Sequence, residues 1–377
     1  MKIVFTGGVT GGHFYPIISI VEEMRNITRE NKLIDPEIYF LAPTPYNKGI
    51  LFDNGIIYKK VFAGKIRRYA SILNFFDLFK TAIGILKALW TVFWIYPDVI
   101  VGKGGYGSFP VLVAAKILHI PVIIHESDSK PGKVNAWAGK FAKKIAISYP
   151  EAAQYFPKNK QDVIALTGCP VRTEIQVPAK EGAHEFLGLE PDLPTILILG
   201  GSQGSMAINN AVLDTLEQLV SRYQIIHQTG KNNFKEVKDT ADLMLDTSFY
   251  KNRYKPFDYM NDLAIRMSAG AADLVISRAG SSIFEIALWG KPSIIIPIPE
   301  DVSHDQRTNA FNYARSGAAE VIEENNLSPE ILLNEIEIIL TDSKYIQEMS
   351  DAAKEFAMPE AARLIAEEVL EMIISHE

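Results

Sequence analysis

Short apolar runs alternate with longer amphipathic segments along most of the chain. The first set of runs comprises KIVFTG, EIYFLA, IIYKKVF, DVIVG, PVIIH and KKIAIS, and it ends near DVIALTGCPVR. A second set begins at Thr195 with TILILG and continues with QIIHQTG, DLVIS and SIIIPI. Buried β-branched runs between helical patterns are typical of parallel strands with helices on both faces of a sheet. The pattern therefore predicts an α/β fold with two doubly wound, Rossmann-like domains.

Four glycine-rich loops directly follow predicted strands. They are TGGVTGGH (residues 6–13), GKGGYGSFP (102–110), GGSQGS (200–205) and SRAGSSIFE (277–285). Glycine lets backbone N–H groups approach an anion closely, and a following helix adds the positive end of its dipole. One such loop could equally be a tight turn. Four of them indicate a shared anionic ligand in a cleft between the domains, because ligands of open parallel sheets bind beyond the carboxyl ends of strands.

Polar side chains beside these loops are candidates for chemistry. His13 lies in the first turn of a predicted helix, where the dipole favours the neutral imidazole, so it is a candidate general base; alternatively it only holds the loop. HESDSKPG contains His125, Glu126 and Asp128, whose spacing resembles no zinc site, and we interpret it as a polar cleft wall. Glu285 is placed to accept hydrogen bonds from ribose hydroxyls, or it is a helix-start carboxylate stabilised by the dipole.

Hydroxyl and amide side chains beside the same loops are further candidates for ligand contacts, whereas the sequence offers no pair of acidic residues suited to a metal ion. Ser202 and Gln203 could donate to a phosphate, and Ser281 and Ser282 are suited to phosphate contact or to N-capping. Gln306 and Asn309 could bind sugar hydroxyls; alternatively, this segment only provides a helix cap through Ser303 or Asp305. No Asp-x-Asp pair ends a predicted strand, so we expect a site without a metal. Amides, hydroxyls and helix dipoles would then stabilise the charge of a leaving group.

Composition narrows the classes of function. The chain has 377 residues, 47% hydrophobic and 22% charged, which is enough for two globular domains. Its net charge of -7 argues against broad binding of nucleic acid. The single cysteine, Cys169, excludes an internal disulfide and fits a reducing compartment. No apolar targeting segment precedes the first strand, so we expect the protein to stay in the cytoplasm.

One segment, residues 66–96, is apolar around most of a predicted helix. Charged residues interrupt it often enough that no uncharged stretch reaches the roughly 20 residues of a membrane span. A basic cluster precedes the helix, and apolar bulk beside basic charge is typical of docking on an anionic membrane surface. We therefore predict such docking through residues 65–95, with burial against a helix or a second subunit as the alternative. The apolar stripe comprises Ile72, Phe76, Phe79, Ile83, Leu86, Trp90 and Phe93, and the basic cluster Lys65, Arg67 and Arg68.

Together these motifs resemble the MurG family, glycosyltransferases of peptidoglycan synthesis that add N-acetylglucosamine to lipid I. Matching stretches cover nearly the whole chain: GGVTGGH, GKGGYGSFP, IPVIIHESDSKPG, GCPVR, GGSQGS, HQTGK, SRAGSSIFE and HDQRTNA. The resemblance implies a GT-B fold whose domains face across a cleft, with the lipid acceptor on residues 1–168 and UDP-N-acetylglucosamine on residues 169–345. Within residues 346–377, the last helix would return to the first domain.

The resemblance also implies an activity and its setting. The sugar would be transferred with inversion at its anomeric carbon, to undecaprenyl-linked lipid I, with no cofactor or required metal. The enzyme would lie peripherally on the cytoplasmic face of the cell membrane. Two other functions remain open: a GT-B transferase for another lipid, such as a diacylglycerol, and a membrane-associated UDP-sugar sensor without catalysis.

Roles follow for residues that match the family motifs. His13 is the preferred base, with Glu126 and Asp128 as second choices. Asp128 stands where the family has an asparagine that contacts the donor sugar, so its role is open. The implied substrate contacts are Thr10, Gly11 and Gly12 with the donor diphosphate and acceptor, Arg172 and Ser202 with the nucleotide and phosphate, the backbone of Met260 with uracil, Ser281 or Ser282 with phosphate, Glu285 with ribose, and Gln306 with the N-acetylglucosamine hydroxyls.

Overall fold

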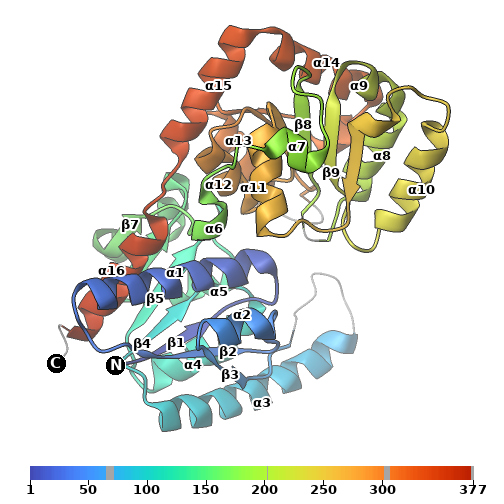
Figure 1. The fold of residues 1–377 in the computed structure, drawn as a ribbon. Helices are drawn as coiled ribbons and strands as arrows, with labels where there is room; N and C mark the ends of the chain where they lie inside the picture. Colours follow the sequence, from blue (N-terminus) through green and yellow to red (C-terminus); the bar gives the residue numbers. More distant parts are fainter. Residues whose placement is uncertain (65–71, 202, 301–305, 375–377) are drawn as a thin grey trace. The chain divides into compact units, whose positions relative to one another are not determined.

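The structure, a computed structural model, divides the chain into two compact units. The first comprises Met1–Arg172 with Met358–Glu377, and the second comprises Thr173–Ala357. Residues 1–64, 72–201, 203–300 and 306–374 are described, without the side chains of residues 72–76. Each unit is a parallel sheet between layers of helices (Figure 1). The predicted α/β class with two doubly wound sheets is confirmed.

In the described part of the first unit, the sheet has seven parallel strands in the order β3-β2-β1-β4-β5-β6-β7. The chain runs outward from β1 to β3 and then returns to β4 beside β1, so the strand order reverses between β1 and β4. There Thr6 lies opposite Gly102. The strands are β1 (Lys2–Thr6), β2 (Glu37–Ala42), β3 (Ile57–Lys60), β4 (Val99–Gly102), β5 (Val122–Glu126), β6 (Lys144–Ile147) and β7 (Ile164–Leu166).

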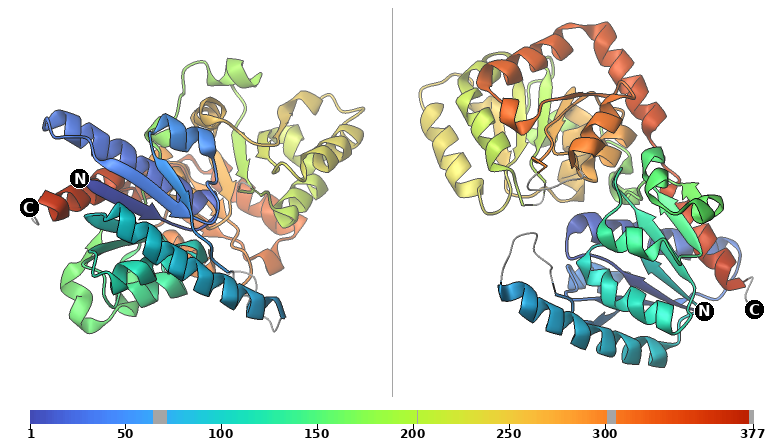
Figure 2. Two further views of the ribbon diagram at one scale, coloured as in Figure 1. Left: turned by 90° about the horizontal axis from the view of Figure 1, so that it is seen from below. Right: turned by 180° about the vertical axis from the view of Figure 1, so that it is seen from behind.

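Helices cover both faces of this sheet because successive side chains of each strand point to opposite faces. Ile3 and Phe5 pack with α1 (Gly11–Glu30) and α16 (Ala361–Ile374), whereas Val4 packs with α3 (Ile72–Ile95) and α4 (Phe109–Ile117). Figures 1 and 2 show the two pairs of helices on opposite sides of the sheet. The shorter helices are α2 (Lys48–Asp53) and α5 (Lys133–Ala138), with 3-10 turns at Tyr106–Ser108, Pro150–Tyr155 and Lys158–Val163.

The second unit repeats this plan with six parallel strands among its described residues, in the order β10-β9-β8-β11-β12-β13. The strand order reverses between β8 and β11, where Leu199 lies opposite Ser277. The strands are β8 (Thr195–Leu199), β9 (Gln224–Gln228), β10 (Tyr254–Phe257), β11 (Leu274–Ser277), β12 (Ser293–Ile295) and β13 (Ala319–Val321).

The helices of the second unit flank its sheet. The core on one face joins Ile196 and Ile198 to Val212 and Ile336. Helix α11 (Asp262–Ala271) contacts β8, and α12 (Ser282–Trp289) contacts β11. The helices are α6 (Thr173–Gln176), α7 (Ala183–Leu187), α8 (Met206–Asp214), α9 (Leu216–Arg222), α10 (Phe234–Met244), α11 (Asp262–Ala271), α12 (Ser282–Trp289), α13 (Gln306–Ala314), α14 (Pro329–Thr341) and α15 (Ser343–Phe356), with 3-10 turns at Lys251–Arg253 and Glu324–Asn326.

Two edge strands are not predicted by the apolar pattern. β10 contains Lys255 and Pro256, residue types that are depleted in strands, and β13 has only three residues. Both strands lie at an edge of the sheet, where one side of the backbone needs no partner strand. Tertiary pairing with the neighbouring strand therefore supplies what the local sequence lacks.

Helix α3 is apolar on two faces. Ala88, Val92 and Ile95 are buried in the core beneath it, whereas Leu86 and Trp90 are 68% and 67% exposed. By length and composition alone, Asp77–Ile95 could cross a membrane, but the core helix of a globular protein has the same properties. The helix nevertheless connects β3 to β4 and packs on α4, which makes it an outer helix of the first unit.

Helix α3 contains part of the segment that we predict to dock on a membrane. Phe79, Ile83 and Phe93 are exposed together with Leu86 and Trp90, so the described members of the predicted apolar stripe all face outward. The basic residues Lys65, Arg67 and Arg68 and the side chains of Ile72 and Phe76 lie outside the described residues.

Packing of α16 on the first sheet is testable with two leucines of the same helix. Leu370 is buried in the core with α1, and Leu364 is 46% exposed. We expect Leu370→Ala to lower the free energy of unfolding of the first unit by about 2–5 kcal/mol, because the truncation leaves a cavity. Leu364→Ala should change it by less than about 1 kcal/mol. Denaturant unfolding of both variants measures the difference, and equal losses would contradict the assigned packing.

Candidate functional site

Two glycine loops flank the point where strand order reverses in the first unit. The loop after β4 lies directly on the loop after β1, because a Cβ at Gly105 would lie 2.9 Å from Gly8 Cα and 3.1 Å from His13 Nε2. Gly105 also has φ +75°, which side chains disfavour. The Lys103 N–H donates to the Thr6 carbonyl at 2.8 Å and continues the pairing past the strand ends. Glycine is thus required here for close packing of two loops.

His13 is held against this pair of loops. It lies in the first turn of α1, and its Nδ1 is 2.8 Å from Thr10 Oγ1. A Cβ at Gly8 would lie 2.7 Å from the same nitrogen, so the ring rests on the glycine backbone. Burial, reinforced by the positive charge of Lys103, lowers the pKa of His13 to about 3. The imidazole is therefore neutral, and when Nδ1–H donates to Thr10, Nε2 keeps its lone pair.

The neighbouring predicted contacts differ in exposure. Thr10 is exposed, and Gly11 and Gly12 are half-buried at the start of α1. A Cβ at Gly11 would lie 2.8 Å from the Tyr46 hydroxyl, so a side chain there would force Tyr46 to shift. The N-terminal amides of α1 thus begin at an accessible position next to His13.

Glu126, at the end of β5, organises the loop that follows it. Its Oε1 accepts from the Asp128 N–H, and its Oε2 accepts from the Gly132 N–H and Asn135 Nδ2, each at 3.0 Å. Burial, followed by the charge of the Asp128 carboxylate, raises the pKa of Glu126 to about 7. Both carboxylate oxygens are used in holding this loop, while Asp128 itself is half-buried.

His125 and Lys103 are buried beside Glu126. His125 Nε2 donates to the Gly168 carbonyl at 3.0 Å, and burial together with the Lys103 charge lowers its pKa well below the ordinary value. Asn135 Nδ2 also donates to the His125 carbonyl at 2.9 Å. A Cβ at Gly104 would lie 2.7 Å from that same Nδ2. The loop after β4 is therefore packed between the loop after β1 and the loop after β5.

Arg172 lies at the end of the first unit. Its guanidinium is 4.2 Å from the centre of the Tyr15 ring, a cation–π distance. The side chain is half-buried. Tyr15 belongs to α1, so the arginine is placed near the helix that carries His13.

In the second unit, the glycine loop after β8 packs on the residue that follows β9. Gly204 has φ +76°, and a Cβ there would lie 2.1 Å from the Thr229 carbonyl oxygen. Ser205 caps α8 by accepting from the Ile208 N–H at 3.3 Å. The predicted contact Gln203 is exposed in this loop, and Ser202 lies outside the described residues.

Arg278, which the sequence does not single out, ties three strand ends together. Its guanidinium donates to Ser205 Oγ at 2.6 Å and to the carbonyls of Ile296 and Pro297 at 3.1 and 3.2 Å. It also forms an ion pair with Glu324. Four acceptors on one planar guanidinium fix the loops after β8, β11 and β12 relative to one another.

The serines that begin α12 have different environments. Ser282 Oγ is 3.0 Å from Ser277 Oγ and donates to the Arg278 carbonyl at 3.2 Å. Ser281 is the N-cap residue, but its side chain makes no capping hydrogen bond. Glu285 lies half-buried in the first turn of the same helix. Ser281 is therefore better placed than Ser282 to offer its hydroxyl to a ligand.

Met260 and Gln306 contribute to separate contacts in the second unit. The Met260 N–H donates to Gln228 Oε1 at 3.0 Å, and Gln228 Nε2 approaches the Gly201 carbonyl at 3.5 Å. Gln306, at the start of α13, accepts from the Ile298 N–H through Oε1 at 3.2 Å. Gln228, which the sequence analysis does not identify, thus connects the loop after β8 with Met260, the residue expected to contact the uracil.

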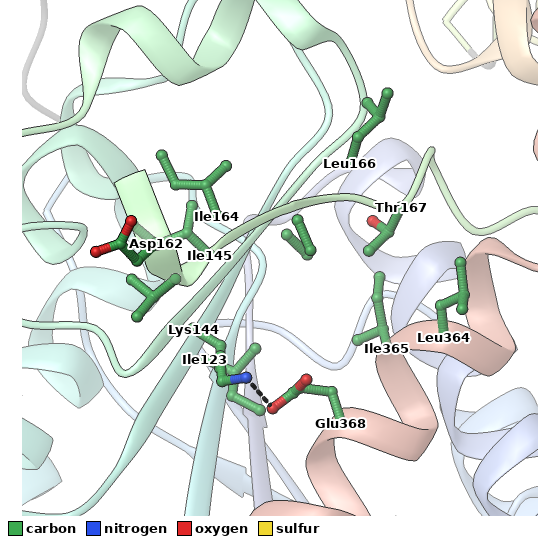
Figure 3. A pocket seen from close by; sticks show the side chains of 13 residues that line it. Ile123, Lys144, Ile145, Asp162, Ile164, Leu166, Thr167, Leu364, Ile365 and Glu368 are labelled. Atoms are coloured by element: carbon green, nitrogen blue, oxygen red, sulfur yellow. Dashed lines mark ion pairs between the residues drawn. The ribbon is translucent and has the colours of Figure 1, made fainter. Parts of the chain in front are cut away.

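Two further features of the described residues bear on chemistry. No three His, Cys, Asp or Glu side chains gather among them as a metal site. A cavity of about 250 Å³ lies away from the glycine loops, between β6, β7 and α16, with the Lys144–Glu368 ion pair of 2.8 Å at its wall (Figure 3). Its lining is mostly aliphatic, including Ile123, Ile164 and Ile365. It lacks the converging polar groups of the reversal points.

The sequence matches two domains of one enzyme family. The Glycosyltransferase family 28 N-terminal domain matches residues 3–147, and the family 28 C-terminal domain matches residues 195–365. Two proteins named UDP-N-acetylglucosamine--N-acetylmuramyl-(pentapeptide) pyrophosphoryl-undecaprenol N-acetylglucosamine transferase are similar throughout. That of Pediococcus pentosaceus is 34% identical, covering 96% of this chain and 97% of its own. That of Natranaerobius thermophilus is 33% identical, covering 99% of this chain and 100% of its own.

Solved structures share the fold. MurG from Acinetobacter baumannii aligns over 98% of this chain and 99% of its own, with a TM-score of 0.71 at 23% identity. A UDP-GlcNAc 2-epimerase from Neisseria meningitidis, bound to UDP-GlcNAc, aligns over 98% and 100% with a TM-score of 0.67 at 14% identity. These structural similarities concern the fold alone. Because a transferase and an epimerase share this fold, it does not distinguish between their activities. Function therefore rests on the sequence relatives.

The environment of Glu126 predicts a specific pH dependence of stability. Its folded pKa of about 7 exceeds the ordinary 4.5, so the folded state binds the proton more tightly. This stabilisation is fully present below pH 4.5 and is lost as the pH rises through 7. The unfolding free energy of the wild type relative to Glu126→Gln should fall across that window, by about 1.4 kcal/mol for each unit of pKa difference.

Denaturant unfolding at several pH values measures this difference. The buried histidines, whose pKa values are lowered, act with the opposite sign, but they are present in both proteins and largely cancel. Glu371→Gln, on an exposed position of α16, is the matched control and should show no such window. A difference for Glu126→Gln that is constant with pH would contradict the raised pKa.

Proposed function

We propose how the residues of this chain perform the reaction of its family. The chain belongs to glycosyltransferase family 28. Within that family it belongs to the UDP-N-acetylglucosamine--N-acetylmuramyl-(pentapeptide) pyrophosphoryl-undecaprenol N-acetylglucosamine transferases. It is a hexosyltransferase that moves N-acetylglucosamine from UDP-N-acetylglucosamine to the muramoyl C4 hydroxyl of lipid I, which yields lipid II for peptidoglycan synthesis. One observation carries this function: relatives of that name match both units along almost their full length. The family predicted from the motifs is thereby confirmed.

The donor is assigned to the second unit. The amides of residues 200–204 and the Ser281 hydroxyl would hold the diphosphate, because both lie at the reversal of strand order, where ligands of doubly wound sheets bind. The N-termini of α8 and α12 add positive dipole ends. Glu285 would accept from the ribose hydroxyls and Gln306 would bind the sugar.

The uracil and the remaining nucleotide contacts follow from the same proposal. The Met260 N–H is occupied by Gln228, so its carbonyl is the backbone group that would face the uracil N–H. Gln203 would extend the phosphate site, and Arg172 would contact the nucleotide as a cation. Amides, hydroxyls and the arginine would together stabilise the departing UDP, so no metal is required for charge stabilisation.

The acceptor and the base are assigned to the first unit. Attack by the C4 oxygen forms a bond to the anomeric carbon while the bond from that carbon to the diphosphate oxygen breaks, and UDP leaves with the electron pair. The C4 proton must pass to a base, and a single displacement inverts the anomeric configuration. His13 Nε2 suits this role because the imidazole is neutral and its other nitrogen is held by Thr10.

The rival bases are less suited to that role. Both oxygens of Glu126 accept hydrogen bonds from its own loop, so its carboxylate is already engaged there. Asp128 is half-buried next to Glu126 and would orient the donor or acceptor sugar as a hydrogen-bond acceptor. Thr10, Gly11 and Gly12 would contact the donor diphosphate and the acceptor through the start of α1.

Membrane docking through α3 completes the proposal. The exposed apolar side chains of this helix form one surface, here called the α3 patch: Leu78, Phe79, Ile83, Leu86, Trp90, Phe93 and Trp94. An apolar surface of this kind inserts into the headgroup boundary, and the lysines of the helix would meet anionic lipid. A lipid-linked acceptor gives such docking a purpose, and it would place the enzyme peripherally on the cytoplasmic face.

Incubation with UDP-N-acetylglucosamine and a lipid I analogue tests the function directly. Disaccharide formation with release of UDP is expected. Product formed only with another lipid, such as a diacylglycerol, would instead support a different acceptor. Binding of the donor with no UDP release in the presence of either lipid would support a sensor.

His13→Ala tests the base. We expect kcat to fall by about 10²–10⁴-fold, the usual contribution of general base catalysis, with donor affinity nearly unchanged. Steady-state kinetics and donor-binding calorimetry measure the two effects, and exposed His119→Ala serves as the control. Turnover close to that of the wild type would exclude His13 as the base.

The α3 patch is tested by replacing Leu86, Trp90 and Phe93 together with serine. We expect binding to vesicles that contain anionic phospholipid to weaken at least about tenfold, because buried apolar area drives insertion. Phe249→Ser, a change at a fully exposed position of the second unit, should have no effect. Co-sedimentation measures both, and unchanged binding of the triple variant would rule out this docking surface.

A further inference from the structure

Four non-glycine residues among those that the structure describes have a left-handed backbone. They are Lys32, Tyr46, Tyr96 and His119, with φ of +54°, +53°, +50° and +58°. Three of them lie one or two residues past a helix, since Lys32 follows α1, Tyr96 follows α3 and His119 follows α4, and this conformation commonly ends a helix. Tyr46 instead lies in the loop between β2 and α2, directly before the N-cap residue Asn47. Its conformation therefore needs another explanation.

A tyrosine with a left-handed backbone is strained. Its Cβ crowds the neighbouring carbonyl, and its side chain is too long for the local hydrogen bond by which asparagine or aspartate tolerates this conformation. Such strain persists only where the surrounding structure imposes it, and it clusters at ligand sites. Here Asn47 Oδ1 accepts from the N–H groups of Gly49 and Ile50 at 3.0 and 3.2 Å, which holds the chain directly after Tyr46.

The side chain of Tyr46 packs on the first turn of α1. Its ring centre lies 4.9 Å from that of Phe14 and 5.8 Å from that of Tyr15. Its hydroxyl lies over Gly11, because a Cβ at that glycine would be 2.8 Å from the Tyr46 oxygen. Gly11 is the first residue of α1 and precedes His13 by two positions. The hydroxyl is thus placed at the start of the helix that carries the proposed base.

The loop that carries Tyr46 also packs against the loop after β4. A Cβ at Gly107 would lie 3.0 Å from Pro43 Cδ, at the beginning of the Tyr46 loop, and 2.6 Å from the Gly7 carbonyl oxygen. The loop after β2 is therefore joined to both glycine loops of the first unit, although the sequence analysis does not identify it. Tyr46 remains 38% exposed in this position. An accessible phenol accordingly lies at the edge of the loops to which we assign the acceptor.

We propose that Tyr46 is a further substrate-binding residue of the first unit, whose hydroxyl donates to an oxygen of the lipid-linked acceptor beside the start of α1. This inference rests on the proposed function, which assigns the acceptor to the first unit. A phenol supplies a hydroxyl for a sugar or phosphate oxygen and an aromatic ring that packs on apolar surface. The strained backbone is explained by this role, because it directs the side chain onto α1.

Tyr46→Phe removes the hydroxyl and keeps both the ring packing and the backbone conformation. We expect the KM for a lipid I analogue to rise at least about fivefold, because one hydrogen bond to the substrate is lost. The KM for UDP-N-acetylglucosamine and kcat should change by less than about twofold. Calorimetry should show weaker binding of the same analogue in the absence of donor. Tyr155→Phe, at an exposed tyrosine of the same unit, is the matched control and should alter neither measurement.

Tyr46→Asn is a second variant that removes the ring as well. Asparagine tolerates the left-handed backbone, so the loop keeps its conformation, and we expect binding of the analogue to weaken further than in Tyr46→Phe. Denaturant unfolding of Tyr46→Phe should give nearly the wild-type midpoint, which separates a lost substrate contact from lost stability. A merely structural tyrosine would lower the midpoint and leave the acceptor KM in place.

The measurements distinguish failure of this inference from failure of the proposed function. Acceptor KM and analogue binding that are unchanged in Tyr46→Phe overturn the inference, and so does a rise confined to the donor KM. If the wild type binds the analogue but transfers no sugar, the proposed function fails, and calorimetry of Tyr46→Phe still decides whether the hydroxyl contacts the analogue. If the wild type does not bind the analogue, both fail.

Discussion

The reversal of strand order in each sheet is the constraint on which the rest of the structure depends. Connections that leave β1 and β4, or β8 and β11, run to opposite sides of the sheet, so the space beyond these strand ends is not filled by a crossover. The loops after β1, β4 and β8 are glycine-rich, and the loop after β11 contains Gly280 and two serines. In both units, these loops and the helix N-termini that follow are therefore the positions at which we propose that the substrates bind.

Close packing of backbone on backbone gives those loops their shape. In the first unit Gly105 lies on Gly8, and in the second Gly204 lies on Thr229, at separations that exclude any side chain. Buried polar groups then fix the loops: Glu126 gathers three N–H donors, and Arg278 gathers four acceptors. Such networks rigidify a site when every member has its hydrogen-bond partners.

Sequence patterns were sufficient where a local signal existed. The apolar run EIYFLA predicts β2 with the bounds that the structure shows, and the glycine loops directly follow β1, β4, β8 and β11, as predicted. β10 and β13 carry no such signal, since pairing with a neighbour forms them. Likewise, the burial of Lys103 could not be predicted from the sequence. Lysine is normally exposed, and its burial here depends on contacts between segments that are distant in the sequence. The roles of Arg278 and Gln228 depend on such contacts too.

Fold and function are supported by different observations here. The fold is shared with an epimerase as well as with a transferase, whereas the sequence relatives identify the transferase. The most direct test of the central claim is a titration of ¹⁵N-labelled protein with UDP, followed by amide shifts. We predict that the largest shifts in the second unit occur at residues 200–204 and 278–282, at the reversal between β8 and β11. Saturable UDP binding that leaves both loops unperturbed would contradict the account.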